Sequence, residues 1–111
     1  MQVFPVINQV GPLPIKSANF KAPVDGPVVF LVTGSVYSGT PNVPLGFTVY
    51  LDTTAIGTAH IFSNGPQTHR AVSPLFIAVN LAEGNHTCSI APMSGAVATD
   101  YNDLFTIQIL Y

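Results

Sequence analysis

Apolar and polar side chains alternate along several short stretches of this sequence. The clearest stretch is 47–52 (FTVYLD), and the same period of two returns within 71–81 and 105–111. A period of two places successive side chains on opposite faces of a β-sheet. Each stretch therefore predicts a strand that turns one face toward a core and the other toward solvent or a partner.

One stretch, 28–32 (VVFLV), breaks the alternation because it is apolar throughout. Strands that are covered on both faces have such continuous apolar runs. We therefore expect one face of this strand to contact the core. Something else must cover the other face, and a second copy of the chain is the favoured candidate.

Turn-forming residues separate these stretches at short intervals. The chain contains ten prolines and nine glycines, and turn signals occur at 25–27, 53–54, 64–66 and 83–85. No stretch has the 3.6-residue apolar period of a helix with caps at its ends. The pattern predicts an all-β fold of about seven or eight strands, packed as an antiparallel two-sheet β-sandwich.

The domain boundaries follow from length and proline content. A chain of 111 residues has room for one core, and we place the single β-sandwich domain at 17–111. Residues 1–16 contain Pro5, Pro12 and Pro14, so they are expected to form an N-terminal arm or an irregular cover. They lack a basic segment and a small-residue cleavage site, so no secretory signal is expected.

The charge content is unusually low. Charged residues make up 7% of the chain and hydrophobic residues 48%, whereas a typical soluble domain has about 25% charged residues. Neutral polar faces and burial in a homo-oligomer would both compensate. With three lysines and arginines (Lys16, Lys21 and Arg70), nucleic-acid binding lacks its main source of affinity. Membrane insertion is not expected either, since no apolar run approaches the roughly 20 residues of a spanning helix.

The metal-binding and redox residue types are sparse. His60, His69 and His86 are far apart in sequence, and His86 and Cys88 form the one close pair of good ligands. Zinc sites bring three or four such groups together, so no metal is expected. Because Cys88 shares an apolar strand face with Ile90, we interpret it as a small core residue.

Catalytic and cofactor motifs do not occur. The sequence has no G-x-S-x-G elbow, no G-x-G-x-x-G and no P-loop pattern. We therefore predict a protein that is not an enzyme, without catalytic residues or a cofactor. A small hydrolase that uses a His/Asp pair is the reading that composition alone leaves open.

The densest polar cluster is 99–103 (TDYND), just before the final strand. Its Tyr101, Asn102 and Asp103 form the candidate ligand-binding set, because an aromatic ring with amide and carboxylate neighbours suits a neutral carbohydrate. The alternative is structural, since Asp and Asn also favour turns for backbone reasons. In that case the cluster is simply the turn that leads into the last strand.

Several segments follow one another in a familiar order: Gly26-Pro27-Val28, VTGSVYSG, FTVYLDTTAIGTA, the His69 segment, LAEGNHTCSIAP and TDYNDLFTIQIL. This order resembles the compact C1q/TNF-like jelly-roll heads of bacterial and phage proteins. In those heads a G-x-H-T turn opens a late strand and an aromatic-bearing strand ends the domain. The matching pieces are Gly84–Thr87 and Phe105–Tyr111.

The resemblance implies jelly-roll topology and a trimer around an axis lined by aromatic and aliphatic side chains. Together with the apolar run, it makes Val29, Leu31, Leu110 and Tyr111 the candidate oligomer interface. We expect a non-enzymatic structural or recognition head that has carbohydrate as its ligand class. The alternative is an immunoglobulin-like adhesion or spacer module without a pocket, since VYLDTTAIGTA before a G-x-H-T turn also resembles bacterial Ig-like repeats.

Overall fold

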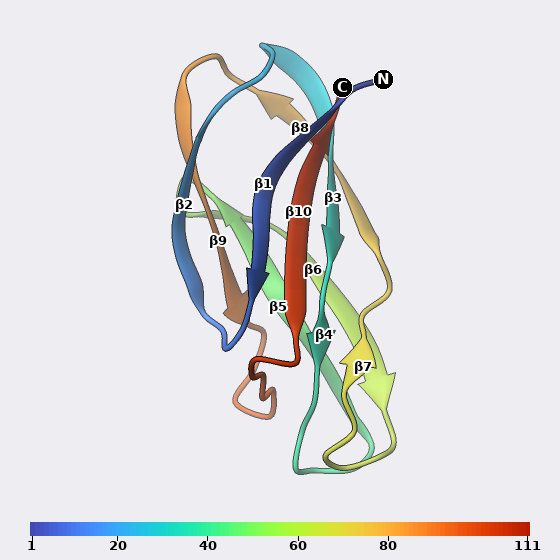
Figure 1. Cartoon of the computed structure of the whole chain (residues 1–111). Coiled ribbons are helices and arrows are strands. Elements are labelled where there is room, and N and C mark those ends of the chain that lie inside the picture. Colours follow the sequence, from blue (N-terminus) through green and yellow to red (C-terminus); the bar gives the residue numbers. More distant parts are fainter.

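The alternating stretches form strands in the computed structural model, which describes residues 1–111 except for the side chain of Ser17 (Figure 1). The strands are β1 (Val3–Val10), β2 (Ile15–Lys21), β3 (Gly26–Thr33), β4 (Ser35–Val36), β5 (Val43–Leu51), β6 (Thr54–Ser63), β7 (Arg70–Ala71), β8 (Leu75–Leu81), β9 (Asn85–Pro92) and β10 (Leu104–Leu110). In the described residues we find no helix of the length and hydrophobicity needed to cross a membrane.

The strands form two main antiparallel sheets that pack face to face (Figure 1). Within the described residues, sheet A has the order β1-β10-β3-β8, sheet B has the order β2-β9-β5-β6, and β4 and β7 form a small third pair. Apart from the β5–β6 hairpin, successive strands of the two main sheets lie in opposite sheets. The prediction of an all-β fold with antiparallel sheets is confirmed.

The core lies between the two sheets and is filled by the alternate residues that the sequence pattern assigned to it. Phe105, Ile107 and Ile109 of β10 are fully buried, as are Phe47 and Val49 of β5. The rings of Phe47 and Phe105 meet edge-on across the two sheets at 5.2 Å. Each such side chain contributes about 1.5–3 kcal/mol to folding when it leaves water, so this layer holds the sheets together.

The first segment of the chain differs from the prediction. Residues 1–16 are not an arm or an irregular cover, because Val3–Val10 forms β1 and pairs with β10. The prolines concealed this strand. Pro5 sits next to a register shift on an edge strand, where a missing N–H is tolerated, and Pro12 and Pro14 lie between β1 and β2.

Two further boundaries also move, again at prolines. The alternating stretch 47–52 lies within a longer strand, since β5 already begins at Val43. Pro44 fits there because β9 pairs with β5 only from Phe47 onward, which leaves one side of β5 unpaired at Pro44. The expected strand 71–81 is split at Pro74, so that β7 pairs with β4 and β8 starts separately.

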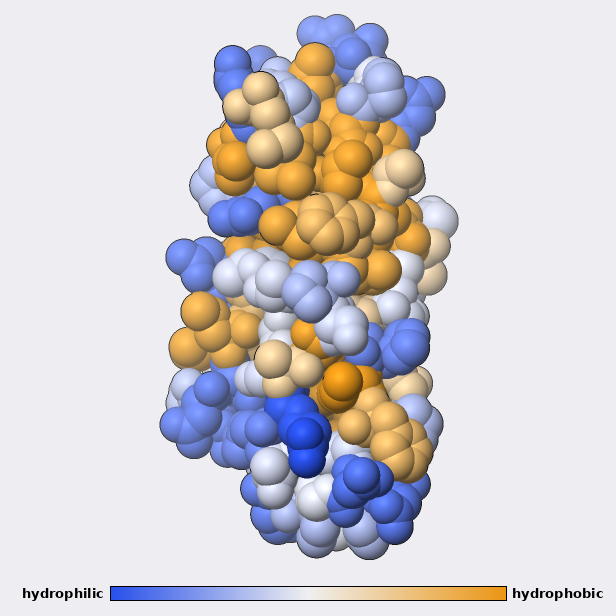
Figure 2. Space-filling view, turned by 90° about the vertical axis from the view of Figure 1, so that its right-hand side faces the viewer, coloured by the Kyte–Doolittle hydropathy of each residue, from blue (hydrophilic) through white to orange (hydrophobic). Residues whose placement is uncertain are grey.

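The two outer faces of the sandwich have different compositions. On sheet A, register neighbours from the four strands bring together an apolar patch around one polar residue, Gln108; its apolar members are Val3, Pro5, Val29, Leu31, Phe76, Ala78 and Leu110. Figure 2 shows hydrophobic residues gathered over the upper part of one side of the molecule. On sheet B, the outward residues of β5 and β9 are mostly hydroxyl-bearing, as Thr48, Thr87 and Ser89 illustrate.

Candidate functional site

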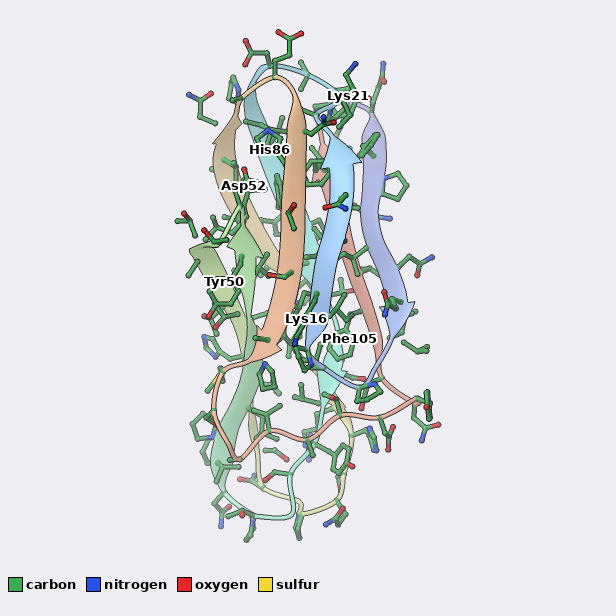
Figure 3. All side chains as sticks on the ribbon, turned by 90° about the vertical axis from the view of Figure 1, so that its left-hand side faces the viewer. Lys16, Lys21, Tyr50, Asp52, His86 and Phe105 are labelled. Atoms are coloured by element: carbon green, nitrogen blue, oxygen red, sulfur yellow. The ribbon has the colours of Figure 1, made fainter. Side chains whose placement is uncertain are left out.

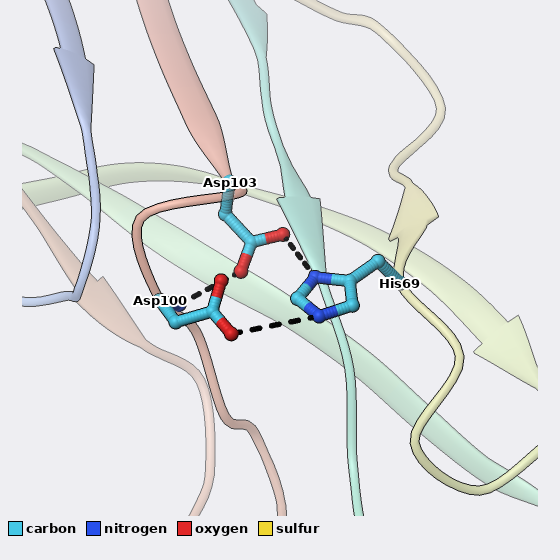
Figure 4. A group of neighbouring side chains, drawn as sticks. All are labelled: His69, Asp100 and Asp103. Atoms are coloured by element: carbon cyan, nitrogen blue, oxygen red, sulfur yellow. Dashed lines mark hydrogen bonds and ion pairs between the residues drawn. The ribbon is translucent and has the colours of Figure 1, made fainter.

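A buried carboxylate, that of Asp103, lies at the centre of a small polar cluster with His69 and Asp100 (Figure 4). Asp103, which directly precedes β10, is 0% exposed. Its Oδ1 accepts hydrogen bonds from Ser35 Oγ at 2.5 Å and from His69 Nδ1 at 2.7 Å. Its Oδ2 accepts one from the Asp100 backbone N–H at 2.8 Å. One side chain thus connects β4, the segment before β7 and the turn before β10.

The histidine of this cluster lies between two carboxylates. Besides its bond to Asp103, its Nε2 lies 3.7 Å from Asp100 Oδ2, and its ring packs on that of Tyr37 with centroids 4.3 Å apart. The hydrogen bond to Asp103 raises the pKa of His69, against partial desolvation, and the charge of Asp103 adds to the effect. The geometry therefore favours an imidazolium that neutralises the buried carboxylate.

This cluster resembles a hydrolytic centre in its residue types but differs in its connections. A Ser–His–Asp triad needs the serine hydroxyl hydrogen-bonded to the imidazole. Here Ser35 and His69 both donate to the same oxygen of Asp103, so the carboxylate lies between them. In this arrangement the carboxylate accepts a hydrogen bond from each side chain, and the imidazole of His69 is not the hydrogen-bond partner of the serine hydroxyl.

The same residues also form a candidate metal centre. His69, Asp100 and Asp103 each offer a ligand atom within 4.8 Å of the others. A metal ligated by Asp103 would have to replace hydrogen bonds that are already made. Among the described residues, every buried side-chain nitrogen and oxygen has a hydrogen-bond partner. The hydrogen bonds to Asp103 therefore satisfy its buried oxygens without a bound ion.

A second histidine–aspartate pair lies on sheet B, at the other end (Figure 3). Asp52 is held at the β5–β6 hairpin, where it and Thr53 have the positive φ values of 49° and 73° that tight hairpin turns require. Its Oδ2 accepts from His86 Nδ1 at 2.5 Å, and its Oδ1 accepts from the Thr87 N–H at 2.8 Å. The pair ties the hairpin to β9.

Both ring nitrogens of His86 face acceptors, because Nε2 lies 2.7 Å from the carbonyl oxygen of Ala82. This backbone contact and the hydrogen bond to Asp52 raise the pKa of His86 despite its partial burial. Desolvation works to raise the pKa of Asp52, but the hydrogen bonds from His86 and Thr87 outweigh it and lower that pKa.

Cys88 lies two residues after His86 on the inward face of β9 and is fully buried. Burial raises the pKa of its thiol to about 12, so the thiolate that a metal ligand or nucleophile needs is strongly disfavoured. Its assignment as a core residue is confirmed. The nitrogens of the neighbouring His86 point to Asp52 and Ala82.

The structure separates the three residues that were candidates for ligand binding. Tyr101 is 79% exposed and Asn102 is also exposed, in the turn before β10. Asp103 is enclosed by the hydrogen bonds described above. A ligand on the surface at Tyr101 and Asn102 therefore does not reach the Asp103 carboxylate in this conformation. The Asn102 N–H donates to Asp100 Oδ1 at 2.8 Å, a local bond typical of an Asx turn.

The candidate interface residues fall into two groups. Val29, Leu31 and Leu110 are half-buried neighbours on the outer face of sheet A, since Leu110 pairs with Val29. Tyr111 packs against the core instead, and its hydroxyl donates to Gln2 Oε1 at 2.9 Å. It therefore fastens the two chain ends together beside the patch.

Sequence reasoning missed an exposed aromatic member of the apolar patch. Phe76 on β8 is 63% exposed and lies beside Leu31 in the sheet register. The alternation within 71–81, which assigned Leu75 and Ile77 to the core, places residue 76 outward. That signal was present but was used only to find the core face.

Sequence reasoning also missed a hollow on the outer face of sheet B. A depression of about 450 Å³ is lined by Lys16, Tyr50 and Ser89, among others. A neighbouring depression of about 510 Å³ includes Lys21, and both include Thr87. These residues lie on three adjacent strands, a proximity that the sequence does not reveal without the strand order.

Comparison with known proteins adds no assignment. No protein-family model matches this sequence, and no curated protein matches it.

Proposed function

We propose that this chain is the subunit of a homotrimeric jelly-roll head, non-enzymatic, that serves as a structural or recognition unit. The observation that carries the proposal is the apolar patch on the outer face of sheet A. The strand order, the low charge content and the resemblance of Gly84–Thr87 and Phe105–Tyr111 to C1q/TNF-like heads support it.

The strand order supports a jelly roll over an immunoglobulin-like fold. An eight-stranded jelly roll consists of two sheets whose strands are connected as Greek keys. Sheets with the orders β1-β10-β3-β8 and β2-β9-β5-β6 fit that connectivity. Immunoglobulin folds keep their first two strands in one sheet, whereas β1 and β2 lie in different sheets.

The composition of the apolar patch supports an oligomer. Phe76 and Val3 are 63% and 52% exposed in the isolated chain, and Leu31 and Leu110 lie between them on the central strands. Burial of side chains of this size contributes about 1.5–3 kcal/mol each. Contiguous apolar surface on a sheet face marks an interaction site. With 7% charged residues, the chain has few charged side chains to place around that face, so burial against another subunit is the favoured way to remove it from water.

The trimeric state follows from the resemblance, because such heads associate around a threefold axis. A closed ring with threefold symmetry uses two different patches on each subunit. The apolar patch would be one of them and would meet a neighbouring surface of the next subunit. We expect the outer face of sheet B, which is not part of the apolar patch, to lie outside this interface.

A neutral carbohydrate at the turn before β10 is the proposed ligand of this head. Tyr101 is 79% exposed, and an exposed aromatic ring next to an amide is the usual surface on which a sugar ring stacks. Asp103 is left out of this site because its carboxylate is buried. A glycan array with the wild type, Tyr101→Ala and Asn102→Ala tests it. Binding that survives both substitutions, or no binding at all, removes the sugar site.

The trimer is tested by light scattering after size exclusion. The wild type should have three times the mass of the 11.7 kDa chain, and Leu31→Lys should lower the mass to that of one chain. His60→Lys, an exposed strand position on the outer face of sheet B, is the matched control and should stay trimeric. A monomeric wild type would overturn the proposal and favour a monomeric adhesion or spacer module.

A further inference from the structure

The outer face of sheet B is hollowed along β9. The outward side chains of this strand are small, namely Thr87, Ser89 and Ala91, while its neighbours carry Lys16 on β2 and Tyr50 on β5. Long side chains on both flanks and short ones between them produce the depression of about 450 Å³. Figure 3 shows Lys16 and Tyr50 on the two strands that flank β9.

The hollow continues toward the upper end of the sheet. The second depression, of about 510 Å³, shares Thr87 with the first and contains Asn19 and Lys21. Lys16 and Lys21 are five residues apart on β2, so they are separated by about 16 Å along the strand. Together the two depressions form one trough with a lysine near each end, which we call the β9 trough.

The charge of the β9 trough is opposite to that of the chain as a whole. The chain has a formal net charge of −2 and three lysines and arginines, two of which line the trough. None of its described lining residues is acidic. Asp52 lies beside the trough with 48% of its side chain exposed, and its carboxylate accepts hydrogen bonds from His86 and from the Thr87 N–H. An anionic ligand would thus meet two lysines in the trough, and the neighbouring Asp52 carboxylate is paired with His86.

Lysines on an edge strand also have a purely structural explanation. β2 is the edge of sheet B, and lysine on an edge strand discourages pairing with another chain. That explanation covers Lys16 and Lys21. It does not account for the aromatic wall at Tyr50 or for the hydroxyl-lined floor at Thr87 and Ser89.

We propose that the β9 trough binds a single chain of an acidic polysaccharide, one whose sugar rings carry carboxylate or sulfate groups. The ring of Tyr50 offers an apolar face for stacking against a sugar ring. Thr87 and Ser89 offer hydroxyls that both donate and accept hydrogen bonds. Lys16 and Lys21 pair with acidic groups several sugar rings apart.

This ligand class fits better than a single-stranded nucleic acid. Nucleic acids carry a phosphate on every nucleotide and are bound by many cations and by stacking of successive bases. The β9 trough provides two lysines and one tyrosine. An acidic polysaccharide offers ring hydroxyls as well as charges, and these match the hydroxyls of Thr87 and Ser89 between the two lysines.

The β9 trough lies within one subunit, so the inference goes beyond the proposed trimer and does not depend on it. In a trimer, three such troughs would act on one polysaccharide and raise its apparent affinity by multivalency. A monomer would bind with the affinity of the single site. The monomeric Leu31→Lys variant should therefore bind the same ligand, only more weakly on a polymer.

The test is a titration of the full-length, ¹⁵N-labelled chain followed by NMR. The probes are a galacturonate oligomer and dextran sulfate, and each is compared with a neutral partner on the same sugar backbone, namely the methyl ester of the galacturonate oligomer and unmodified dextran. We expect at least one acidic probe to give saturable shifts at Lys16, Lys21, Thr87 and Ser89. The neutral partners should leave these signals unchanged.

Substitutions assign the binding to the trough. The double variant Lys16→Gln/Lys21→Gln should lower the affinity at least about tenfold, equivalent to about 1.4 kcal/mol. Tyr50→Ala should lower it several-fold. Arg70→Gln, an exposed cation on β7 outside the trough, is the control and should bind like the wild type.

Four results would overturn the proposal: no shifts with either acidic probe, equal binding of a neutral partner, equal affinity of the lysine double variant, or equal affinity for an oligothymidylate. The last result would mean that the trough attracts any polyanion by charge alone. Because the titration is read at single residues, it does not depend on the number of subunits, so failure of the trimer would be detected separately by mass.

Discussion

The two sheets of this sandwich share one core but present different outer faces. Inward, both are built from Val, Ile, Leu and Phe. Outward, the central strands of sheet A carry Val29, Leu31 and Leu110 at one end and polar residues toward the other, whereas those of sheet B carry Thr48 and Ser89. The inner faces are dictated by folding. The outer faces are not, so their difference reflects what each face contacts once the chain has folded.

The difference also separates two kinds of function. When another protein surface covers an apolar sheet face, the free energy falls in proportion to the apolar area removed from water. A hollow with hydroxyls, an aromatic ring and two lysines suits a polar ligand that stays partly hydrated. On this view sheet A assembles the head and sheet B recognises a ligand.

The largest expected effect comes from charging the apolar patch. We expect the unfolding temperature of the wild type to rise with protein concentration, because association stabilises the folded chain by mass action. In Val29→Lys/Leu110→Lys, which alters two paired neighbours, this dependence should disappear. Each lost kcal/mol lowers the unfolding temperature by about 4–8 °C in a domain of this size.

The matched control is Thr48→Lys/Thr58→Lys, which puts two lysines on paired strands of sheet B and so introduces similar repulsion. Calorimetry at several protein concentrations compares the two variants. If the sheet B variant also lost its concentration dependence, the effect would be due to charge repulsion and not to the apolar patch.

A smaller effect is expected from the polar clusters that belong to the two sheets. Asp103 precedes β10 of sheet A and is fully buried, whereas Asp52 lies in the hairpin of sheet B with 48% of its side chain exposed. Removal of one partner from a buried charge pair costs about 3–5 kcal/mol, and Asp103→Ala should approach the lower end because His69 is partly exposed. Asp52→Ala should cost about 1 kcal/mol.

Urea unfolding of the two variants measures the difference directly. Equal losses would contradict the account, because they would mean that burial of the carboxylate does not decide its contribution. Ser35→Ala provides a further check, since it removes one of the three donors to Asp103 and leaves the charge in place.

The free energy of unfolding should fall as the pH rises through the raised pKa values of two histidines. His69 and His86 both have a pKa raised above the ordinary value of 6.5, so their contribution to stability is complete below that pH. It is lost as the pH rises through the raised folded value. Urea unfolding at pH 5.5 and 8.5 should show this loss, and His69→Gln/His86→Gln should reduce it.

At acid pH the contribution of Asp52 should make the free energy of unfolding fall as the pH decreases. Its pKa is lowered below 3.8 in the folded chain, so its contribution is present above that value and is lost as the pH falls through the lowered one. In Asp52→Asn the unfolding free energy should change less between pH 5 and pH 2.5. An unchanged acid dependence would contradict this role.

The smallest expected effect concerns the threonine pairs on the outer faces. Thr48 and Thr58 are joined by a side-chain hydrogen bond of 2.9 Å on sheet B, and Thr33 and Thr106 form a similar pair on sheet A. Such cross-strand pairs contribute roughly 0.2–1 kcal/mol. Thr48→Val and Thr33→Val should each destabilise by less than about 1 kcal/mol in urea unfolding. A much larger loss would mean that the threonine supports more than its partner.

The sequence pattern was sufficient to identify the strands whose alternation is regular. The inward faces of 47–52 and 105–111 follow directly from it, because a shift by one residue would turn the whole apolar set of a strand away from the core. The pattern failed where proline interrupts a strand without ending it. β1 was missed for this reason. Pro5 lies at a register shift of an edge strand, and β1 still pairs with β10 before and after this shift.

The candidate sites were harder to predict because they depend on strand order. His69 and Asp103 are 34 positions apart, and only the fold brings them within 2.7 Å. Tyr50 and Lys16 flank the same strand only because β9 lies between β5 and β2. Side-chain types indicate what chemistry is available, but their distances are set by pairings that local patterns do not encode.

The most direct test of the account compares two phenylalanines on the two faces. Phe76 on sheet A and Phe62 on sheet B are 63% and 56% exposed in the isolated chain, and both lie on edge strands. Hydroxyl-radical footprinting of the native protein measures their oxidation side by side. The account predicts that Phe76 is protected while Phe62 is oxidised, and that Leu31→Lys exposes Phe76. Equal oxidation of the two residues in the wild type would contradict the claim that sheet A is the assembling face.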